Sequence, residues 1–268
     1  MTKPIFKHFD KISWNRLSRN TSVDVIQLLD ENQEKIHWYY LSGNSCPEAI
    51  KLLAQNKKKI NWYELSRNEC PDAVELLKQK SKRIYWNCLS SNSCSSAVKL
   101  LSQNQDKINW MNLSFNICPE AVKLLVQNPD KIDLNCLSLN TCPDAIKILA
   151  QNLDKINWDY LSFNTCPDAV KILAQNLDKI NWNYLSSNSC PEAVNLLAQN
   201  PNKIDWIMLS RNSSSEAVQL LLKLDLEAMK ENNHEFWKEL VEYVFHPARV
   251  VRFAENAEME LCDYLELF

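Results

Sequence analysis

The sequence predicts an all-α fold: a right-handed-type α-solenoid of nine 24-residue helix-turn-helix repeats with a helical C-terminal cap. Two observations lead to this prediction. Tryptophan recurs at a step of 24 residues through most of the 268-residue chain. In the second half of each unit, apolar residues follow the spacing of a helix face, as in Ala169–Leu173. A fixed period of this length is typical of solenoids, in which stacked units share one core.

The repeated unit reads K-I-[DN]-W-x-x-L-S-x-N-x-C-P-[DE]-A-[VI]-x-[LI]-L-x-Q-N-x-D and runs from Lys11 to about Leu226. Residues 1–10 precede it as a lead-in, and residues 227–268 follow it as the predicted cap. Leu134 takes the place of tryptophan in the sixth repeat. The tryptophans of the other eight repeats are expected to be structural: Trp14, Trp38, Trp62, Trp86, Trp110, Trp158, Trp182 and Trp206.

A 24-residue period also suits leucine-rich repeats, whose strand needs alternating Leu-x-Leu followed by asparagine. Here Ile12, Trp14 and Leu17 are spaced two and then three residues apart. Runs of β-branched residues with glycine turns are missing, and the chain holds a single glycine, Gly43. We therefore expect two short helices in each repeat and no strand.

The first helix of a repeat, helix A, is expected to begin at the Asn or Asp before tryptophan, because both residues are good N-caps. In repeat seven this N-cap is Asn157, and Trp158, Leu161 and Ser162 then share one face. A small serine on that face would let a neighbouring helix approach closely. The sequence further predicts that asparagine ends both helices in the left-handed conformation, in place of glycine. The positions concerned are Asn20, Asn44 and Asn164 after helix A, and Asn152 after helix B.

The second helix, helix B, is expected to begin within Thr165–Asp168, where Pro167 suits a first helical turn. Thr165 and Asp168 have the spacing of a capping box, in which a hydroxyl and a carboxylate satisfy free amides. Other repeats share this spacing, as Ser45 with Glu48, Thr141 with Asp144, Ser189 with Glu192 and Ser213 with Glu216. Cys166 would then fill space beneath the turn.

The ends of the repeat array differ from its middle, as expected of terminal repeats. The first repeat has Thr21–Asp24 at the start of helix B, and the ninth has Ser213–Glu216. An amphipathic stretch around Phe236–Val244 follows the array, His246-Pro247 breaks it, and a second helical stretch is expected up to Phe268.

The repeat, written K-I-D/N-W-x-x-L-S-x-N-x-x-P-x-A-I-x-L-L-x-x-N-P-D-K, resembles the short helical repeats of uncharacterised proteins of giant viruses, the large nucleocytoplasmic DNA viruses. Val244–Arg249 is similar to the His-Pro-x-Arg tail of such proteins. The resemblance implies a helical solenoid, a viral source and no enzymatic activity. This chain departs from the family pattern by placing Cys before Pro, so the resemblance lends no support to a haem or metal role.

Charge and targeting signals restrict the class of protein. The formal net charge of −3 gives no footprint for nucleic acid or for an anionic membrane. We find no run of 18 apolar residues and no secretory signal in residues 1–14. We therefore expect a cytoplasmic protein, in a host cell or virion if viral, with reduced cysteines.

The recurring cysteines are better explained by packing than by chemistry. Stacked repeats place equivalent residues about 8–10 Å apart, which is too far for a disulfide or for shared zinc ligands. Cys88 and Cys136, two residues after the tryptophan position, are instead expected on the outer side of helix A. The recurring set comprises Cys46, Cys70, Cys94, Cys118, Cys142, Cys166 and Cys190.

No catalytic pattern rises above the repeat. The four histidines have no ligand or catalytic spacing, and one glycine cannot form a phosphate-binding loop. We predict no enzyme, no cofactor and no metal. A lysine recurs on helix B, usually three residues after Asp or Glu, which favours a solvated face of ion pairs over a track for phosphates. These lysines are Lys51, Lys99, Lys123, Lys147 and Lys171.

Positions that vary between repeats are the candidates for binding. They are the two residues after tryptophan and the residue after the recurring serine, which share one face of helix A. In the middle repeats they are Met111, Phe115, Leu139, Tyr160, Phe163 and Tyr184, which either bind a protein or pack between adjacent helices. We expect a non-enzymatic scaffold for protein–protein interaction. The alternatives are a structural virion or assembly component and a nucleic-acid-binding solenoid.

Overall fold

The fold is known from a computed structural model that describes residues 11–222. The predicted lead-in (1–10) and the predicted C-terminal cap (227–268) lie outside the described residues. Within them the chain is a succession of α-helix pairs with a period of 24 residues, which confirms the all-α solenoid. The sequence missed one recurring element, because each pair is joined to the next by a 3₁₀-helix of three residues.

Helix A opens every repeat and has four to six residues. The helices A are α1 (Trp14–Arg19), α3 (Trp38–Ser42), α5 (Trp62–Arg67), α7 (Trp86–Ser90), α9 (Trp110–Phe115), α11 (Leu134–Leu137), α13 (Trp158–Phe163), α15 (Trp182–Ser186) and α17 (Trp206–Leu209).

Helix B is longer, with eight or nine residues. The helices B are α2 (Val23–Asp30), α4 (Pro47–Gln55), α6 (Pro71–Lys78), α8 (Ser95–Ser102), α10 (Pro119–Val126), α12 (Pro143–Ala150), α14 (Pro167–Ala174), α16 (Pro191–Ala198) and α18 (Ser215–Leu222). The 3₁₀-helices are η2 (Gln33–Lys35), η3 (Lys57–Lys59), η4 (Ser81–Arg83), η5 (Gln105–Lys107), η6 (Pro129–Lys131), η7 (Leu153–Lys155), η8 (Leu177–Lys179) and η9 (Pro201–Lys203).

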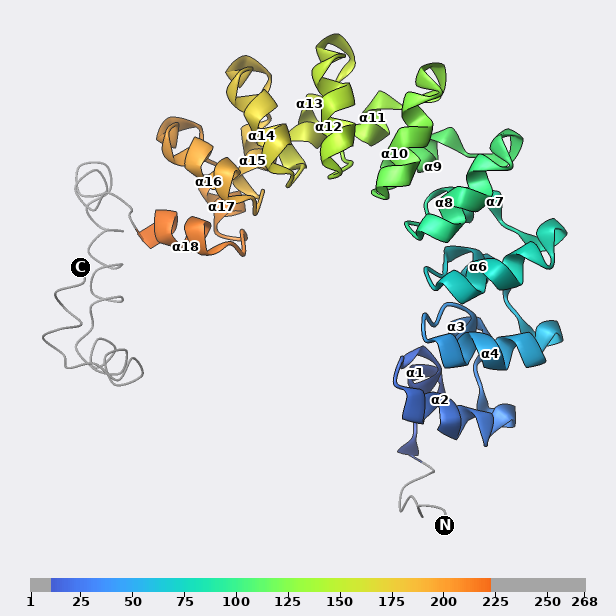
Figure 1. The fold of residues 1–268 in the computed structure, drawn as a ribbon. Helices are drawn as coiled ribbons and strands as arrows, with labels where there is room; N and C mark the ends of the chain where they lie inside the picture. Colours follow the sequence, from blue (N-terminus) through green and yellow to red (C-terminus); the bar gives the residue numbers. More distant parts are fainter. Residues whose placement is uncertain (1–10, 223–268) are drawn as a thin grey trace, which may run out of the picture.

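The repeats follow one another along an arc, and α1 and α18 lie at its two ends (Figure 1). Each helix B packs against the neighbouring helices B, and the helices A pack against one another in the same way, except that α11 and α13 make little or no contact. The array therefore has two layers of helices. The loops that follow α2, α4 and α6 lie on the outer side of the arc (Figure 1), so the 3₁₀-helices η2, η3 and η4 are on the convex edge.

The interior is built on leucine rather than on tryptophan. Leu161 and Leu173 of repeat seven have no exposed surface, and the equivalent leucines of the other inner repeats are buried in the same way. Trp158 is only partly buried and packs against this core from one side. At the end of the array Trp206 is 41 % exposed. Burial of a leucine side chain is worth about 1.5–3 kcal/mol, so the two leucine rows are the main source of cohesion.

Helix A begins as the sequence predicts wherever Asn or Asp precedes tryptophan. The side chain of Asn157 accepts a hydrogen bond from the amide of Tyr160 at 3.1 Å, and that of Asp133 accepts from Cys136 at 2.9 Å. His37 and Tyr85 stand at the same position in repeats two and four and make no cap. The N-cap prediction is therefore confirmed, and it fails only where the residue type changes.

The prediction that asparagine ends the helices in the left-handed conformation is wrong. Asn164 has φ −70° and ψ 122°, which is extended, and Asn152 has φ −136°. The single glycine, Gly43, also has a negative φ of −88°. Asn152 instead closes helix B with its side chain, whose amide donates to the carbonyl of Ile148 at 2.8 Å. A side-chain donor does here what a left-handed residue does elsewhere, so glycine is not needed.

Asn164 has a different role, which is to join repeats. Its side-chain amide donates to the carbonyls of Ser138 and Asn140 in the preceding repeat, at 2.9 and 3.0 Å. Its Oδ1 accepts from the amide of Cys166 at 2.9 Å. The same bonds recur from Asn44 through Asn212. We call this series of buried side chains the asparagine ladder; it runs Asn44, Asn68, Asn92, Asn116, Asn140, Asn164, Asn188, Asn212.

The recurring serine also joins repeats. Ser162 is fully buried, its hydroxyl donates to the carbonyl of Trp158 at 2.7 Å and accepts from the amide of Asn181 in the next repeat at 3.0 Å. The sequence predicted only that a small side chain lets the helices approach. Together, the serine and the asparagine ladder form a polar seam between neighbouring helices A.

The predicted capping box is wrong by one residue. Helix B begins at Pro167 as expected, but its N-cap is Cys166, whose side chain makes no cap bond. Thr165 is exposed. The turn before helix B is closed by Asn164, whose side-chain oxygen accepts a hydrogen bond from the Cys166 amide. In the ninth repeat Ser214 occupies the cysteine position, and its hydroxyl does accept from the amide of Ala217 at 3.1 Å.

Candidate interaction surface

The helix A face is the outer surface of the short helices α1 to α17. It consists of the two positions after tryptophan and the one after the seam serine. These positions point away from the leucine core because the tryptophan, leucine and serine between them occupy the inner side of the same helix. In many repeats these positions therefore show solvent side chains whose type is not dictated by the core.

Five of the six predicted binding residues are exposed on this face. The exposed fractions run from 39 % for Phe115 to 55 % for Met111. Leu139 departs from the prediction, since it lies just after the end of α11, is half-buried and offers little surface. The exposed set is Met111, Phe115, Tyr160, Phe163 and Tyr184, from α9, α13 and α15. Ile207 of α17, which is 69 % exposed, continues it into repeat nine, and the sequence reasoning missed it.

The alternative of lateral packing holds for part of the set. The rings of Phe163 and Tyr184 meet edge to face with centroids 6.4 Å apart, so neighbouring repeats touch through them. Phe163 is nevertheless 51 % exposed, and Tyr184 is 42 % exposed. The face thus has apolar surface that the chain itself does not cover.

Polar side chains fix the spacing of this face. The side-chain amide of Asn181 donates to Asp159 of the preceding repeat at 2.8 Å, and that of Asn157 donates to Asn135 at 3.3 Å. Such bonds between successive helices A hold the exposed rings at a constant register. A surface that is ordered before binding loses less entropy when a partner docks.

The N-terminal repeats present a different helix A face. Arg19 stacks over the ring of Tyr40, with its guanidinium carbon 3.8 Å from the ring centroid, and the His37 ring stacks on the same Tyr40 ring with centroids 4.3 Å apart. Tyr63 and Tyr85 meet edge to face at 5.5 Å. Repeats one to four therefore show aromatic and cationic groups together, whereas repeats five to eight show apolar groups among asparagines and serines.

The recurring cysteines lie under the start of helix B, as predicted. Cys46, Cys70, Cys118, Cys142, Cys166 and Cys190 are buried, and Cys94 is partly buried. The thiol of Cys118 donates to Glu120 at 3.0 Å, and burial raises the pKa of this thiol. A protonated buried thiol is a poor nucleophile and a poor metal ligand. All nine cysteines of the described residues are free of disulfides.

The placement of Cys136 on the outer side of helix A was wrong. Cys88 is partly exposed, but Cys136 is only 4 % exposed. At the same register Tyr160 and Tyr184 are long enough to reach solvent, whereas a thiol is too short. Burial, helped by the neighbouring Asp133, raises the pKa of Cys136 to about 11.

The lysines of helix B form the predicted ion pairs in part of the array. Lys171 meets Asp168 at 2.7 Å and Lys147 meets Asp144 at 2.7 Å. Lys51 lies 3.5 Å from Glu48. These pairs are exposed, so each contributes little to the stability of the fold. Repeats four and five are the exceptions.

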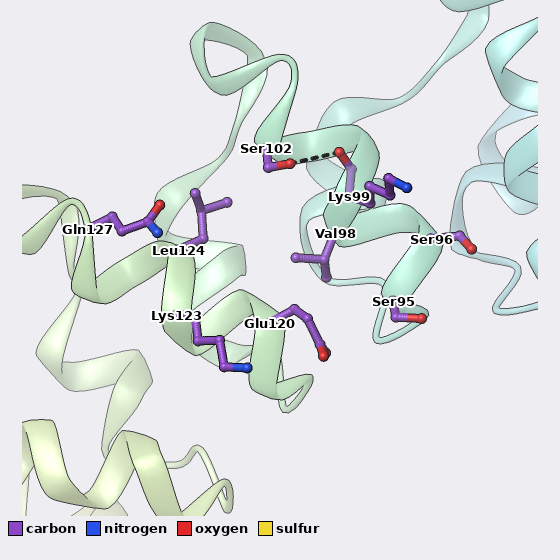
Figure 2. Close-up of a pocket in the computed structure, with 9 residues that line it drawn as sticks. All are labelled: Ser95, Ser96, Val98, Lys99, Ser102, Glu120, Lys123, Leu124 and Gln127. Carbon is purple, nitrogen blue, oxygen red and sulfur yellow. Dashed lines mark hydrogen bonds between the residues drawn. The ribbon is translucent and has the colours of Figure 1, made fainter.

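A groove lies between α8 and α10 at this exception (Figure 2). It has a volume of about 440 Å³ and is lined by Ser95, Ser96, Val98, Lys99, Ser102, Glu120, Lys123, Leu124 and Gln127. Lys99 has Ser96 three residues before it instead of a carboxylate. The carboxylate of Glu120, which could pair with Lys123, accepts from the Cys118 thiol. The groove is open to solvent. On its wall, the Ser102 hydroxyl donates a hydrogen bond to the Lys99 carbonyl at 2.8 Å.

Neither this groove nor the helix A face gathers a set of metal ligands. Within residues 11–222 no cluster of three His, Cys, Asp or Glu side chains could hold a metal ion. In the same part of the chain no helix has the length and apolar composition to cross a membrane.

Comparison with models of known protein families, with curated proteins and with solved structures finds no match for this chain.

Proposed function

We propose that the chain is a non-enzymatic repeat scaffold that binds a protein segment along the helix A face of repeats five to eight. The observation that supports this most is the group of exposed apolar side chains on α9, α13 and α15, with Phe163 at 51 % and Met111 at 55 %. Interfaces between proteins are enriched in aromatic residues and methionine at their centres. A partner segment with apolar side chains would fit this face.

The polar residues around the apolar set support the same partner class. Asn112, Asn135 and Asn183 lie between the exposed rings, and the Asn112 side-chain amide donates to the carbonyl of Asn87 in the preceding repeat at 2.9 Å. A rim of amide side chains, with Asp159 as its one carboxylate in repeats five to eight, can hydrogen bond to a peptide backbone of either direction. The viral source that the resemblance implies, and the roles as a virion component or a nucleic-acid-binding solenoid, stay predictions.

The test is a site-specific photocrosslink. A photoreactive phenylalanine analogue replaces Phe163, and crosslinked proteins from a cell lysate are identified by mass spectrometry. A second chain with Phe115→Ser and Tyr184→Ser around the same crosslinker should lose the captured protein by at least about tenfold, because each lost aromatic anchor costs ~1–2 kcal/mol of binding.

The matched control removes exposed apolar residues elsewhere. Val126 is 59 % exposed and Leu177 is 44 % exposed, and neither lies on a helix A. Val126→Ser and Leu177→Ser in the crosslinking chain should leave capture unchanged. Equal capture by the two double variants would exclude the helix A face as the binding surface.

A further inference from the structure

The 3₁₀-helices differ sharply in charge along the array. In repeats five, six and eight an Asp pairs with the Lys that follows it, as for Asp106 and Lys107 at 2.8 Å. In η3 the three residues are Lys57, Lys58 and Lys59, and η4 ends in Lys82 and Arg83. The 3₁₀-helices η3 and η4 therefore lack the aspartate that pairs with lysine in η5, η6 and η8.

Six cations lie together on this part of the convex edge, which we call the basic edge: Lys57, Lys58, Lys59, Lys80, Lys82 and Arg83. All six are exposed, and none forms an ion pair with any residue among 11–222. The ammonium of Lys57 donates to Oε1 of Gln79 at 3.3 Å, which joins η3 to the segment just before η4. The two 3₁₀-helices are thus one surface.

Three of the acidic residues of the same repeats are engaged elsewhere. Between residues 57 and 83 there are eight Lys and Arg against four Asp and Glu. Glu75 pairs with Lys78 at 2.6 Å, Glu69 accepts from the hydroxyl of Ser93 at 2.6 Å, and Glu64 hydrogen bonds to Tyr39. The cations of the basic edge are consequently free to meet an external anion.

Aromatic rings lie directly beside the basic edge. Tyr85 is two residues after Arg83 and is 52 % exposed, and Tyr63, at 39 % exposure, meets it edge to face at 5.5 Å. The guanidinium of Arg67 lies 5.9 Å from the Tyr63 ring, and its nitrogen donates to the Tyr63 hydroxyl at 3.4 Å. Cations and accessible ring faces are therefore interleaved over repeats two to four.

We propose that the basic edge, with Tyr63 and Tyr85, binds single-stranded nucleic acid. Phosphates contact the lysines and Arg83, and unstacked bases lie against the two rings. Base stacking on aromatic residues needs bases that are not paired, which favours a single strand over a duplex. An acidic peptide or an anionic lipid surface would use the cations but would gain little from tyrosine rings. This site is separate from the proposed protein-binding face of repeats five to eight.

The first experiment measures fluorescence anisotropy of a fluorescein-labelled 20-nucleotide oligothymidine and oligouridine with the full chain. Six phosphate contacts predict a slope of about −4 for the logarithm of affinity against the logarithm of salt, or about 300-fold weaker binding at 200 mM than at 50 mM salt. The variant K58Q/K59Q/K82Q/R83Q should bind at least about 100-fold more weakly at 50 mM, with a shallower slope.

The matched control removes the same number of charges from the other 3₁₀-helices. K107Q/K131Q/K155Q/K179Q neutralises four exposed lysines of η5 to η8. This variant should keep wild-type affinity within about threefold. Because all eight residues are on the surface, both variants should keep the wild-type helical circular dichroism and urea midpoint. No binding by the wild-type chain at 50 mM salt, or equal losses in the two variants, would overturn the proposal.

The second experiment separates stacking from charge. Y63L/Y85L should weaken oligonucleotide binding by about 10- to 100-fold with an unchanged salt slope, since stacking is worth ~1–3 kcal/mol per base. Y160L/Y184L, on the proposed protein-binding face, should have no effect. Vesicles rich in phosphatidylserine and a polyglutamate peptide are the competing partners. If either binds the wild-type chain as tightly as the oligonucleotides, or if Y63L/Y85L binds like wild type, the surface is a general anion site and the proposal is wrong.

Discussion

The seam and the helix A face are made by the same short helices, yet they follow opposite rules. At the seam, Ser162 and Asn164 recur almost without change in all nine repeats. On the face, the position between them is occupied by Arg, Gly, Ser, Phe or Leu. The difference teaches that the residues that join one repeat to the next are constant, whereas the solvent-exposed residues vary.

The seam is polar although it is buried, and this explains its constancy. Each ladder asparagine satisfies two carbonyls and one amide that no helix pairs, and a substitute must offer the same two donors and one acceptor. Leaving a buried backbone group unpaired costs about 1–3 kcal/mol. An apolar residue of similar size fails this requirement. The exposed positions of the helix A face have no such requirement, so many residue types can occupy them.

The largest effect should follow from breaking the middle of the asparagine ladder. The Asn116 amide donates to Ser90 and Asn92 at 3.0 and 2.8 Å, and its Oδ1 accepts from Cys118 at 2.9 Å. Asn116→Ala should lower the free energy of unfolding by about 3–5 kcal/mol, measured by urea titration.

The control for this variant is the first asparagine of the array. Asn20 is exposed, and its side chain accepts one hydrogen bond, from the amide of Ser22 at 2.9 Å. Asn20→Ala should cost under about 1 kcal/mol, since no carbonyl of a preceding repeat depends on it. Similar losses for Asn20 and Asn116 would mean that bonds between repeats are not what makes the ladder stabilising.

A smaller effect is expected from the serine of the seam. The Ser114 hydroxyl donates to Trp110 at 2.9 Å and accepts from the Asp133 amide of the next repeat at 3.1 Å. Ser114→Ala should cost about 1–3 kcal/mol because it leaves that amide without an acceptor. Ser210→Ala is the control, since Ser210 is exposed and only donates to Ile207 at 2.7 Å. Unfolding midpoints that shift equally in the two variants would contradict the role of the bond between repeats.

The sequence was sufficient for the period, the helix pairs and the solvated lysine pairs, because these depend on spacing within one repeat. It was insufficient for the seam. Asparagine is both a helix-ending residue and a double donor, and only the position of the preceding repeat shows which role applies at Asn164. The capping box failed because helix B begins one residue later than its spacing implies, with Cys166 as the N-cap and the Cys166 amide donating to Asn164.

The candidate surfaces were predictable to a similar degree. Variation between repeats located Phe163 and Met111 correctly, because a repeat unit can vary only where it does not pack. It misplaced Leu139 and Cys136, whose exposure depends on side-chain length relative to neighbours. The basic edge escaped notice because the whole chain has a net charge of −3 and its cations are clustered rather than numerous.

A third prediction compares two thiols at one register of the helix A face. The pKa of Cys136 is raised to about 11, and Cys88 is partly exposed with a less raised pKa. With iodoacetamide at pH 8, Cys88 should be alkylated at least about tenfold faster than Cys136, as measured by mass spectrometry of the intact fold. Equal rates would show that repeat six opens readily and that the seam does not protect it.

The raised pKa of Cys136 also makes the stability of the fold depend on pH. The unfolded thiol ionises near 9.0, whereas the folded thiol holds its proton up to about pH 11. The stability that depends on the neutral buried thiol is present below pH 9 and is lost as the pH rises through 11. Cys136→Ala should therefore lose less stability than wild type between pH 9 and 11. Parallel curves for the two chains would contradict the assignment.

The smallest effect on stability is expected on the helix A face itself, at Phe163. Its ring is 51 % exposed, and its ring contact with Tyr184 is at 6.4 Å. Phe163→Ala should change the free energy of unfolding by under about 1 kcal/mol, although it removes the whole phenyl ring. Leu161→Ala, two residues earlier in α13, removes a smaller group but creates a cavity at a fully buried site, so it should cost about 2–5 kcal/mol. If Phe163→Ala costs as much as Leu161→Ala, the phenylalanine belongs to the core, and the middle repeats have no free aromatic anchor to offer a partner.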